Sequence, residues 1–256
     1  MLKVYDTIKD KDLQAKLIPI DFMKPPFRCV IVGYSGSGKT NVVKNILFNK
    51  EWGYNSYFDQ IFVFCGSSDD VREYNRFAFK TNVPVWNEKK QDYYKSIKVN
   101  LTEKMLIEQN TSPEDIKDLI MELEDNDLNN ESSLFVFDDM IVDKLLKNTT
   151  NMNVLDEIYV RGRHIGKGIS VIITTQKLRA VKQNLRFTNS THLVVFHGLS
   201  PFDLDIVVKE NSGYLTFEEF RDLYNLHVDK KYRFIVIHQK GSAGRYIQND
   251  KLEWIA

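Results

Sequence analysis

The 256-residue sequence has little cysteine, no long apolar run and no net charge, and each shortage excludes a class of protein. Two cysteines, Cys29 and Cys65, are too few for the disulfide framework of a small secreted domain. Both lie in apolar runs, which is typical of small buried residues. No stretch approaches the ~20 apolar residues that span a bilayer, and the N-terminus has no signal-peptide core. We therefore expect a soluble, intracellular protein.

The charge balance argues against a protein that coats nucleic acid as a single subunit. Its 35 basic residues are matched by 35 acidic ones, whereas such proteins are usually basic. Any hold on DNA has to come from local patches or from several subunits on one duplex. The five histidines and two cysteines show no metal-ligand spacing. With 43% hydrophobic residues, the chain has enough apolar side chains for a large core.

Short apolar runs alternate with amphipathic segments along most of the chain. The runs that predict strands are 27–32, 60–65, 134–137, 169–174, 192–196 and 232–238. Capping signals that predict helix starts are Ser112-Pro113, Ser200-Pro201 and Thr216-x-x-Glu219. This alternation indicates an α/β fold with a mainly parallel sheet covered on both faces. We expect an N-terminal extension at 1–26 and a single domain at 27–256, with an irregular insertion at about 67–132.

A glycine-rich loop follows the first predicted strand and opens a helix. Residues 33–40 fit G-x-x-x-x-G-K-[ST] completely, and both the strand before and the helix after are in place. The glycines let backbone N–H groups face phosphate oxygens at the helix N-terminus. Lys39 then reaches the β- and γ-phosphates, and the Thr40 hydroxyl ligates Mg²⁺. The residues expected to hold ATP are Gly33, Ser35, Gly36, Ser37, Gly38, Lys39, Thr40 and Asn41.

Two carboxylates follow a second apolar strand, as a phosphate-binding loop requires. The strand at 134–137 ends in Asp138-Asp139, and ligands of α/β proteins bind at the carboxyl ends of strands. We expect Asp138 to hold Mg²⁺ through water and Asp139 to orient and deprotonate the attacking water. Many related sites have Glu at the second position. Because Asp139 is one methylene shorter, either the strand end lies closer or another residue is the base.

A polar residue ends a third apolar strand. If the strand at 169–174 lies between the other two, Gln176 points at the γ-phosphate and senses it; otherwise it only caps the strand. Just before this strand, Arg163 is the first candidate for an arginine supplied to a neighbouring subunit's ATP, and Arg161 is the second. A cation at a helix end is also favourable in any protein, so both interpretations stay open.

Basic residues gather in two further places. Lys177, Arg179, Lys182 and Arg186 occur with no acid among them, and the last three fall at helical spacing on one face. They form either a DNA-backbone contact or a solvated face. A weaker candidate patch combines four lysines with two tyrosines: Lys89, Lys90, Tyr93, Tyr94, Lys95 and Lys98.

The glycine loop, the Asp138-Asp139 strand end, the Arg163-His164 pair and the Thr175-Gln176 strand end together resemble the FtsK–HerA superfamily. More closely, residues 26–200 resemble the poxvirus-type genome-packaging ATPases of large DNA viruses and virophages. This resemblance implies a three-layer α/β/α P-loop fold of the RecA-like, additional-strand kind. It also implies a homo-oligomeric ring, with a hexamer favoured, that drives double-stranded DNA into a preformed capsid and contacts a capsid or portal-like protein. The expected location is the host cytoplasm or virus factory, or the virion itself.

Two other functions compete with a packaging motor. A small-molecule or nucleotide kinase would need an arginine-rich lid and an acceptor site, and the paired aspartates and Gln176 argue against it. The other alternative is a nucleotide-gated assembly protein with little hydrolysis, which the short Asp139 side chain leaves possible.

Overall fold

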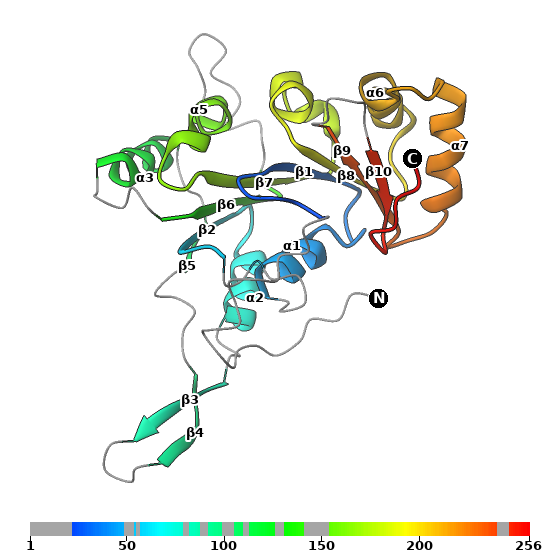
Figure 1. Ribbon diagram of the computed structural model, residues 1–256. Coiled ribbons are helices and arrows are strands. Elements are labelled where there is room, and N and C mark those ends of the chain that lie inside the picture. The colour runs from blue at the N-terminus through cyan, green and yellow to red at the C-terminus, as the bar shows by residue number, and fades with distance from the viewer. Residues whose placement is uncertain are drawn as a thin grey trace.

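The computed structural model of the chain describes residues 22–48, 54, 57–78, 82–87, 92–98, 105–109, 113–125, 131–140, 154–239 and 246–256. An eight-stranded sheet in the order β10-β9-β8-β1-β7-β6-β2-β5 forms its centre (Figure 1). Its strands are β1 (Arg28–Val32), β2 (Gln60–Cys65), β5 (Met105–Gln109), β6 (Ser133–Asp138), β7 (Ile169–Thr175), β8 (His192–Phe196), β9 (Phe234–His238) and β10 (Tyr246–Asn249). Every pair from β8 to β5 is parallel, and β9 is antiparallel to both of its neighbours.

Helices cover both faces of this sheet, which confirms the expected three-layer architecture. One face carries α1 (Lys39–Phe48) and α2 (Ser68–Ala78), and the other carries α3 (Pro113–Asp125), α5 (Val154–Arg161), α6 (Pro201–Asn211) and α7 (Phe217–His227). Both C-terminal helices begin where their capping signals predict. Ser200 accepts a hydrogen bond from the Asp203 backbone, and Thr216 and Glu219 form a reciprocal capping box.

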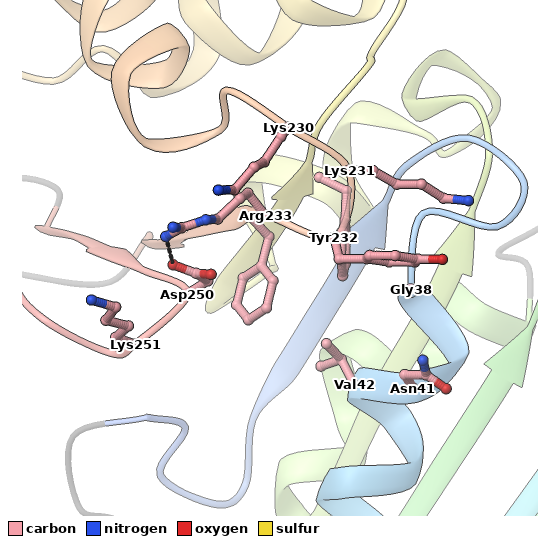
Figure 2. A pocket seen from close by; sticks show the side chains of 11 residues that line it. Gly38, Asn41, Val42, Lys230, Lys231, Tyr232, Arg233, Asp250 and Lys251 are labelled. Atoms are coloured by element: carbon pink, nitrogen blue, oxygen red, sulfur yellow. Dashed lines mark hydrogen bonds and ion pairs between the residues drawn. The ribbon is translucent and has the colours of Figure 1, made fainter. Parts of the chain in front are cut away.

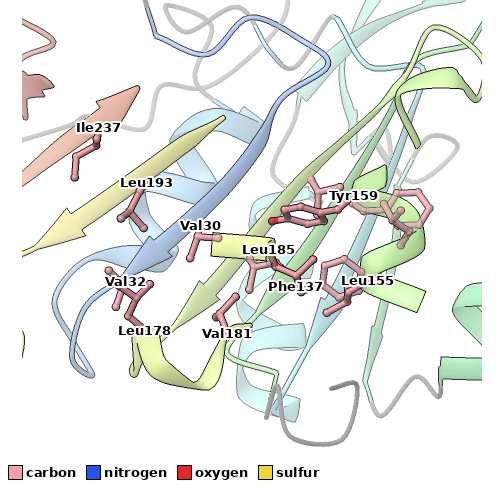
Figure 3. Packing of buried hydrophobic residues seen from close by; sticks show 14 of the residues in the cluster. Val30, Val32, Phe137, Leu155, Tyr159, Leu178, Val181, Leu185, Leu193 and Ile237 are labelled. Carbon is pink, nitrogen blue, oxygen red and sulfur yellow. The ribbon is translucent and has the colours of Figure 1, made fainter. Parts of the chain in front are cut away.

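Alternate residues of each strand enter two separate apolar layers, because successive side chains of a strand point to opposite faces. On β1, Val30 and Val32 pack with the layer under α3, α5, α6 and α7 (Figure 3), while Cys29 and Ile31 pack against α1. β1, β6, β7 and β8 are buried along their whole length. Both cysteines are buried and free, as expected.

The segment at 67–132 is more regular than the sequence suggested. It contains α2, a separate antiparallel pair made of β3 (Asn82–Asn87) and β4 (Asp92–Lys98), the edge strand β5, and α3. The helix predicted after Ser112 is present, with Ile116, Ile120 and Leu123 buried. At the other end, residues 1–21 of the predicted extension lie outside the described residues, whereas Phe22 and Met23 belong to the core. The division into extension, domain and insertion stays a prediction.

No helix in the described part of the chain is long and apolar enough to cross a membrane.

A buried histidine, His192, packs against the half-buried His238 where β8 begins and β9 ends. The rings of His192 and His238 meet edge to face with centroids 4.7 Å apart, and the Thr191 hydroxyl lies 2.7 Å from His192 Nδ1. Burial, reinforced by the charge of His238, lowers the pKa of His192 to about 3. The ring is therefore neutral in the folded protein at pH values where the unfolded chain binds a proton.

This burial predicts acid sensitivity. As pH falls below the ordinary histidine pKa of about 6.5, only the unfolded state gains a proton, so stability is lost progressively until about pH 3. Relative to pH 7, His192 should cost about 2 kcal/mol of unfolding free energy at pH 5. Urea denaturation of wild type and His192→Gln at both pH values measures this difference. An equally large pH-dependent loss in His192→Gln would assign the sensitivity to other groups.

Candidate functional site

The glycine loop lies between β1 and α1, at the carboxyl edge of the sheet. The Gly33 N–H donates to the Thr175 carbonyl at 3.2 Å, which fastens the start of the loop to the end of β7. A Cβ on Gly33 would lie 2.5 Å from Ser37 Oγ and 2.7 Å from Phe196 Cβ, so only glycine fits there. Ser35 and Gly36 are exposed, as is Asn41 in the first turn of α1. The loop therefore opens to solvent above the helix N-terminus.

Lys39 is buried, and its ammonium group turns back over the loop. Its Nζ donates to the Gly33 carbonyl at 3.0 Å and to the Tyr34 carbonyl at 3.3 Å. The same atom lies 3.6 Å from Asp139 Oδ2. A full positive charge is thus held at the mouth of the loop, next to a carboxylate from another strand.

Asp139 and Gln176 complete this cluster, because β7 lies between β1 and β6 as the sequence hypothesis required. Gln176 Nε2 donates to Asp139 Oδ2 at 3.3 Å. Asp139 has a left-handed backbone with φ +44, and a Cβ on Gly66 would meet its carbonyl at 2.3 Å. Only glycine at position 66 permits this close approach to the Asp139 backbone. Lys39, Asp139 and Gln176 therefore meet although they are distant in sequence.

Asp138 has a different environment from its neighbour. It is completely buried, and its two carboxylate oxygens accept hydrogen bonds from Tyr74 Oη and Thr174 Oγ1, each at 2.6 Å. Burial raises the pKa of Asp138, against these hydrogen bonds, which lower it. Thr174 also accepts the Asp139 N–H at 2.8 Å. Through Thr174, β7 fixes the positions of both aspartates.

Tyr74 was not anticipated from the sequence. It lies on α2, a helix that was missed although a capping signal marks its start: Ser67 Oγ accepts the Asp70 N–H at 3.2 Å. The ring is fully buried among residues of the α1 face. The only sequence signal for Tyr74 was therefore a Ser-x-x-Asp helix start.

Arg163 and Arg161 do not join this cluster. Arg161 ends α5 and forms ion pairs with Glu157 at 2.5 Å and Glu124 at 2.9 Å. Arg163 lies in the short 3-10 helix Gly162–His164, is exposed, and bonds to the His164 ring. Both precede β7, whose seven residues place them about 20 Å from the carboxyl edge of the sheet.

The predicted basic face at 177–186 is not one helix, so that expectation is wrong. A 3-10 helix, Leu178–Ala180, and a π-helix, Asn184–Thr188, are separated by extended backbone at Val181. Leu178, Val181 and Leu185 nevertheless all enter the core.

Two of the cations in this segment are used internally. Lys182 pairs with Asp156 at 2.9 Å, and Arg186 pairs with Glu210 at 2.7 Å. Lys177 and Arg179 are exposed. In the second candidate patch, Lys89 and Lys90 lie outside the described residues, and the side chains of β4 are not described.

Comparison with known proteins identifies the family. The family model described as "Poxvirus A32 protein" matches residues 14–240. The chain belongs to the poxvirus A32 protein family. This is a family of genome-packaging ATPases. A comparison with curated protein sequences finds no match.

Solved structures of other proteins share the fold of this chain. The genome packaging NTPase B204 of Sulfolobus turreted icosahedral virus 2, in complex with ATP-gammaS, is 15% identical with a TM-score of 0.59, covering 88% of this chain and 98% of that one. EssC (ATPases 2 and 3) of Geobacillus thermodenitrificans is 10% identical with a TM-score of 0.50, covering 88% of this chain and 39% of that one. The pCW3 conjugation coupling protein TcpA is 12% identical with a TM-score of 0.50, covering 89% of this chain and 61% of that one. At these identities the likeness shows the fold alone.

Tyr74→Phe tests whether the buried hydroxyl positions Asp138. Losing this donor disfavours the charged carboxylate, so the pKa of Asp138 rises further. The acid limb of the ATPase pH–rate profile should move to higher pH, and the rate should fall about tenfold. Tyr57→Phe, in a half-buried tyrosine that packs on Phe58, is the control. An unshifted acid limb in a folded Tyr74→Phe protein would remove Tyr74 from the site.

Proposed function

We propose that this protein is an ATP-driven motor that translocates double-stranded DNA into a preformed viral capsid. The observation that carries the proposal is the meeting of Lys39, Asp139 and Gln176 at one carboxyl edge of a parallel sheet. A cation for the phosphates, a carboxylate for water and an amide beside it are the groups that hydrolysis of a γ-phosphate needs. Membership of the packaging family supplies DNA and a capsid as the context.

The residues of the loop fit a bound triphosphate. The buried Ser37 hydroxyl has no hydrogen-bond partner among the described residues, and the space above Gly36 is open. Backbone N–H groups of the loop would face phosphate oxygens. Lys39 would exchange its carbonyl contacts at Gly33 and Tyr34 for the β- and γ-phosphates.

The donors near the loop also suit Mg²⁺. This ion prefers oxygen and is usually held by one or two carboxylates together with substrate phosphates. The described residues contain no group of three or more His, Cys, Asp or Glu that could hold a metal alone. Thr40 would supply its hydroxyl. Asp138 would act through water, because each of its oxygens keeps a further lone pair beside the bond from Tyr74 or Thr174. The metal would neutralise charge on the phosphates.

Asp139 is positioned to act as the base. Water attacks the γ-phosphorus, its proton passes to the Asp139 carboxylate, and ADP leaves as the bond to the γ-phosphoryl breaks. Despite its short side chain, Asp139 brings Oδ2 to 3.6 Å from Lys39 Nζ, which supports this role. Gln176, hydrogen-bonded to the same oxygen, is placed to report whether the γ-phosphate is present. A kinase is disfavoured because this amide stands where an acceptor would bind.

The charge of the chain and the position of Arg163 favour a ring of subunits around the DNA. The chain is neutral, and two of the four cations at 177–186 are paired internally. One copy therefore offers few contacts to a duplex, and several copies around it would multiply them. Arg163 lies too far from its own loop to act there, but a ring would carry it to a neighbour's ATP. Such a motor would work in the host cytoplasm or virus factory.

Lys39→Ala and Asp139→Asn test the hydrolytic site. Lys39→Ala removes the charge facing the phosphates and should lower ATP turnover at least about a hundredfold. Asp139→Asn should bind MgATP as wild type does but fail to hydrolyse it. Steady-state release of phosphate, with and without linear duplex DNA, and calorimetric binding measure the two effects. Wild-type rates in Lys39→Ala would place the nucleotide site elsewhere, and a wild type without turnover would favour a gated assembly protein.

Mixing two inactive variants tests the arginine in trans. Arg163→Ala subunits keep an intact loop, and Lys39→Ala subunits keep an intact arginine. A mixed ring pairs one with the other, so part of the ATPase activity should return. Arg161→Ala, at an arginine already paired with Glu124 and Glu157, is the matched control and should retain activity. If the two variants assemble together but ATPase activity does not return, Arg163 does not act on a neighbour's ATP and is only a cation at a helix end.

A further inference from the structure

A cavity of about 670 Å³ adjoins the glycine loop on the side away from Asp139. Gly38, Asn41 and Val42 form one wall, and the segment 230–234 with Asp250 and Lys251 forms the other (Figure 2). These walls belong to the β8–β9 side of β1, whereas Asp139 and Gln176 belong to the β7–β6 side. A volume of this size accommodates a small organic ligand, and neither aspartate of the ATPase site borders it.

Tyr232 is held over this cavity in an unfavourable backbone conformation. Its φ is +73, which is a genuine outlier for a bulky residue. The turn is fixed by neighbouring bonds: the Arg233 N–H donates to the Lys230 carbonyl at 3.1 Å, and the His197 N–H donates to the Arg233 carbonyl at 3.0 Å. The ring is nevertheless 55% exposed. Strain that is maintained to present an exposed aromatic side chain points to a ligand.

The ring lies beside the phosphate loop. A Cβ on Gly38 would be 3.3 Å from Tyr232 Cδ1, so the edge of the ring borders the last glycine of the loop. Figure 2 shows the ring extending across the N-terminal end of α1 above Asn41 and Val42. Asn41 directly follows Thr40, and it lines the cavity. A triphosphate in the loop would therefore continue past Asn41 into the cavity.

The charges around the cavity favour a base with acceptor atoms. Lys231 Nζ lies 4.9 Å from the centre of the Tyr232 ring, and Lys230 and Lys251 are exposed on the rim. Asp250 is the only carboxylate among the described lining residues, and it is paired with Arg233 at 3.0 Å. The described part of the rim thus offers cationic donors, and its one carboxylate is already paired.

We propose that this cavity binds the nucleoside of the substrate, with a purine base stacked on Tyr232. This inference rests on the proposed ATPase function and names the part of the site that holds the base. Stacking uses the face that every base has, and the lysines can donate to the N7 acceptor of adenine or guanine. The site therefore accepts ATP and GTP with similar affinity.

The test compares ligands with and without a base. Calorimetry in magnesium buffer measures the dissociation constants of AMPPCP, GMPPCP and inorganic tripolyphosphate for wild type and Tyr232→Ala. Loss of stacking should weaken both nucleotides about tenfold and leave tripolyphosphate within about twofold, since that ligand has no base to lose. Tyr232→Phe keeps the ring and should match wild type. Tyr214→Ala, at a tyrosine that is 83% exposed and does not line the cavity, is the matched control.

Each other outcome has a distinct meaning. An equal loss of tripolyphosphate in Tyr232→Ala would show that the ring supports the loop through Gly38, and unchanged nucleotide affinity would place the base elsewhere; either result overturns the inference. Much tighter binding of either AMPPCP or GMPPCP would contradict the similar affinities expected for ATP and GTP. If Tyr232→Ala misfolds, Tyr232→Gly removes the ring while permitting the left-handed backbone. A wild type that binds none of the three ligands overturns the ATPase function itself.

Discussion

Side chains that follow three different strands meet at Asp139 Oδ2. Lys39 approaches it from the helix after β1, and Gln176 approaches it from the end of β7. The contact exists only because β7 lies between β1 and β6, so that three carboxyl ends are adjacent at one edge. A parallel pairing of β1 directly with β6 would leave Gln176 outside the cluster. The strand order is therefore the constraint on which the reacting half of the site depends.

The two neighbouring aspartates suit the different roles proposed for them because their surroundings differ. Asp138 is buried with both oxygens hydrogen-bonded, and desolvation raises its pKa. Such a group is held in one orientation and is suited to fixing a position. Asp139 is 30% exposed and faces Lys39, which leaves it open to water. Thr174 connects them, since it donates to Asp138 and accepts from the Asp139 backbone. The arrangement keeps a partly exposed carboxylate beside a buried one.

Features with a local signature could be predicted from the sequence. Residues 33–40 match a motif of fixed spacing. An apolar run marks β8, and capping signals mark the starts of α6 and α7. The position of Gln176 was predictable only as a condition, because strand order is a long-range property. Tyr74 and Tyr232 could not be assigned roles. One is a buried ring on a polar helix, and the other depends on a backbone angle that no residue pattern specifies.

The failed prediction at 177–186 has the same origin. Arg179, Lys182 and Arg186 fit a helical period, and so do the buried Leu178, Val181 and Leu185, yet extended backbone at Val181 interrupts the segment. The polar residues then pair with whatever acids lie near, here Asp156 and Glu210.

The shape of the phosphate loop also depends on a strand that contributes no catalytic group. Phe196, the last residue of β8, lies where a Cβ on Gly33 would fall. Its carbonyl accepts the Tyr224 hydroxyl of α7 at 2.8 Å in the buried core. The neighbouring His197 N–H holds the turn that carries Tyr232. The end of β8 therefore supports the loop from one side and the aromatic turn from the other, so the phosphate and nucleoside portions of the site share one rigid support.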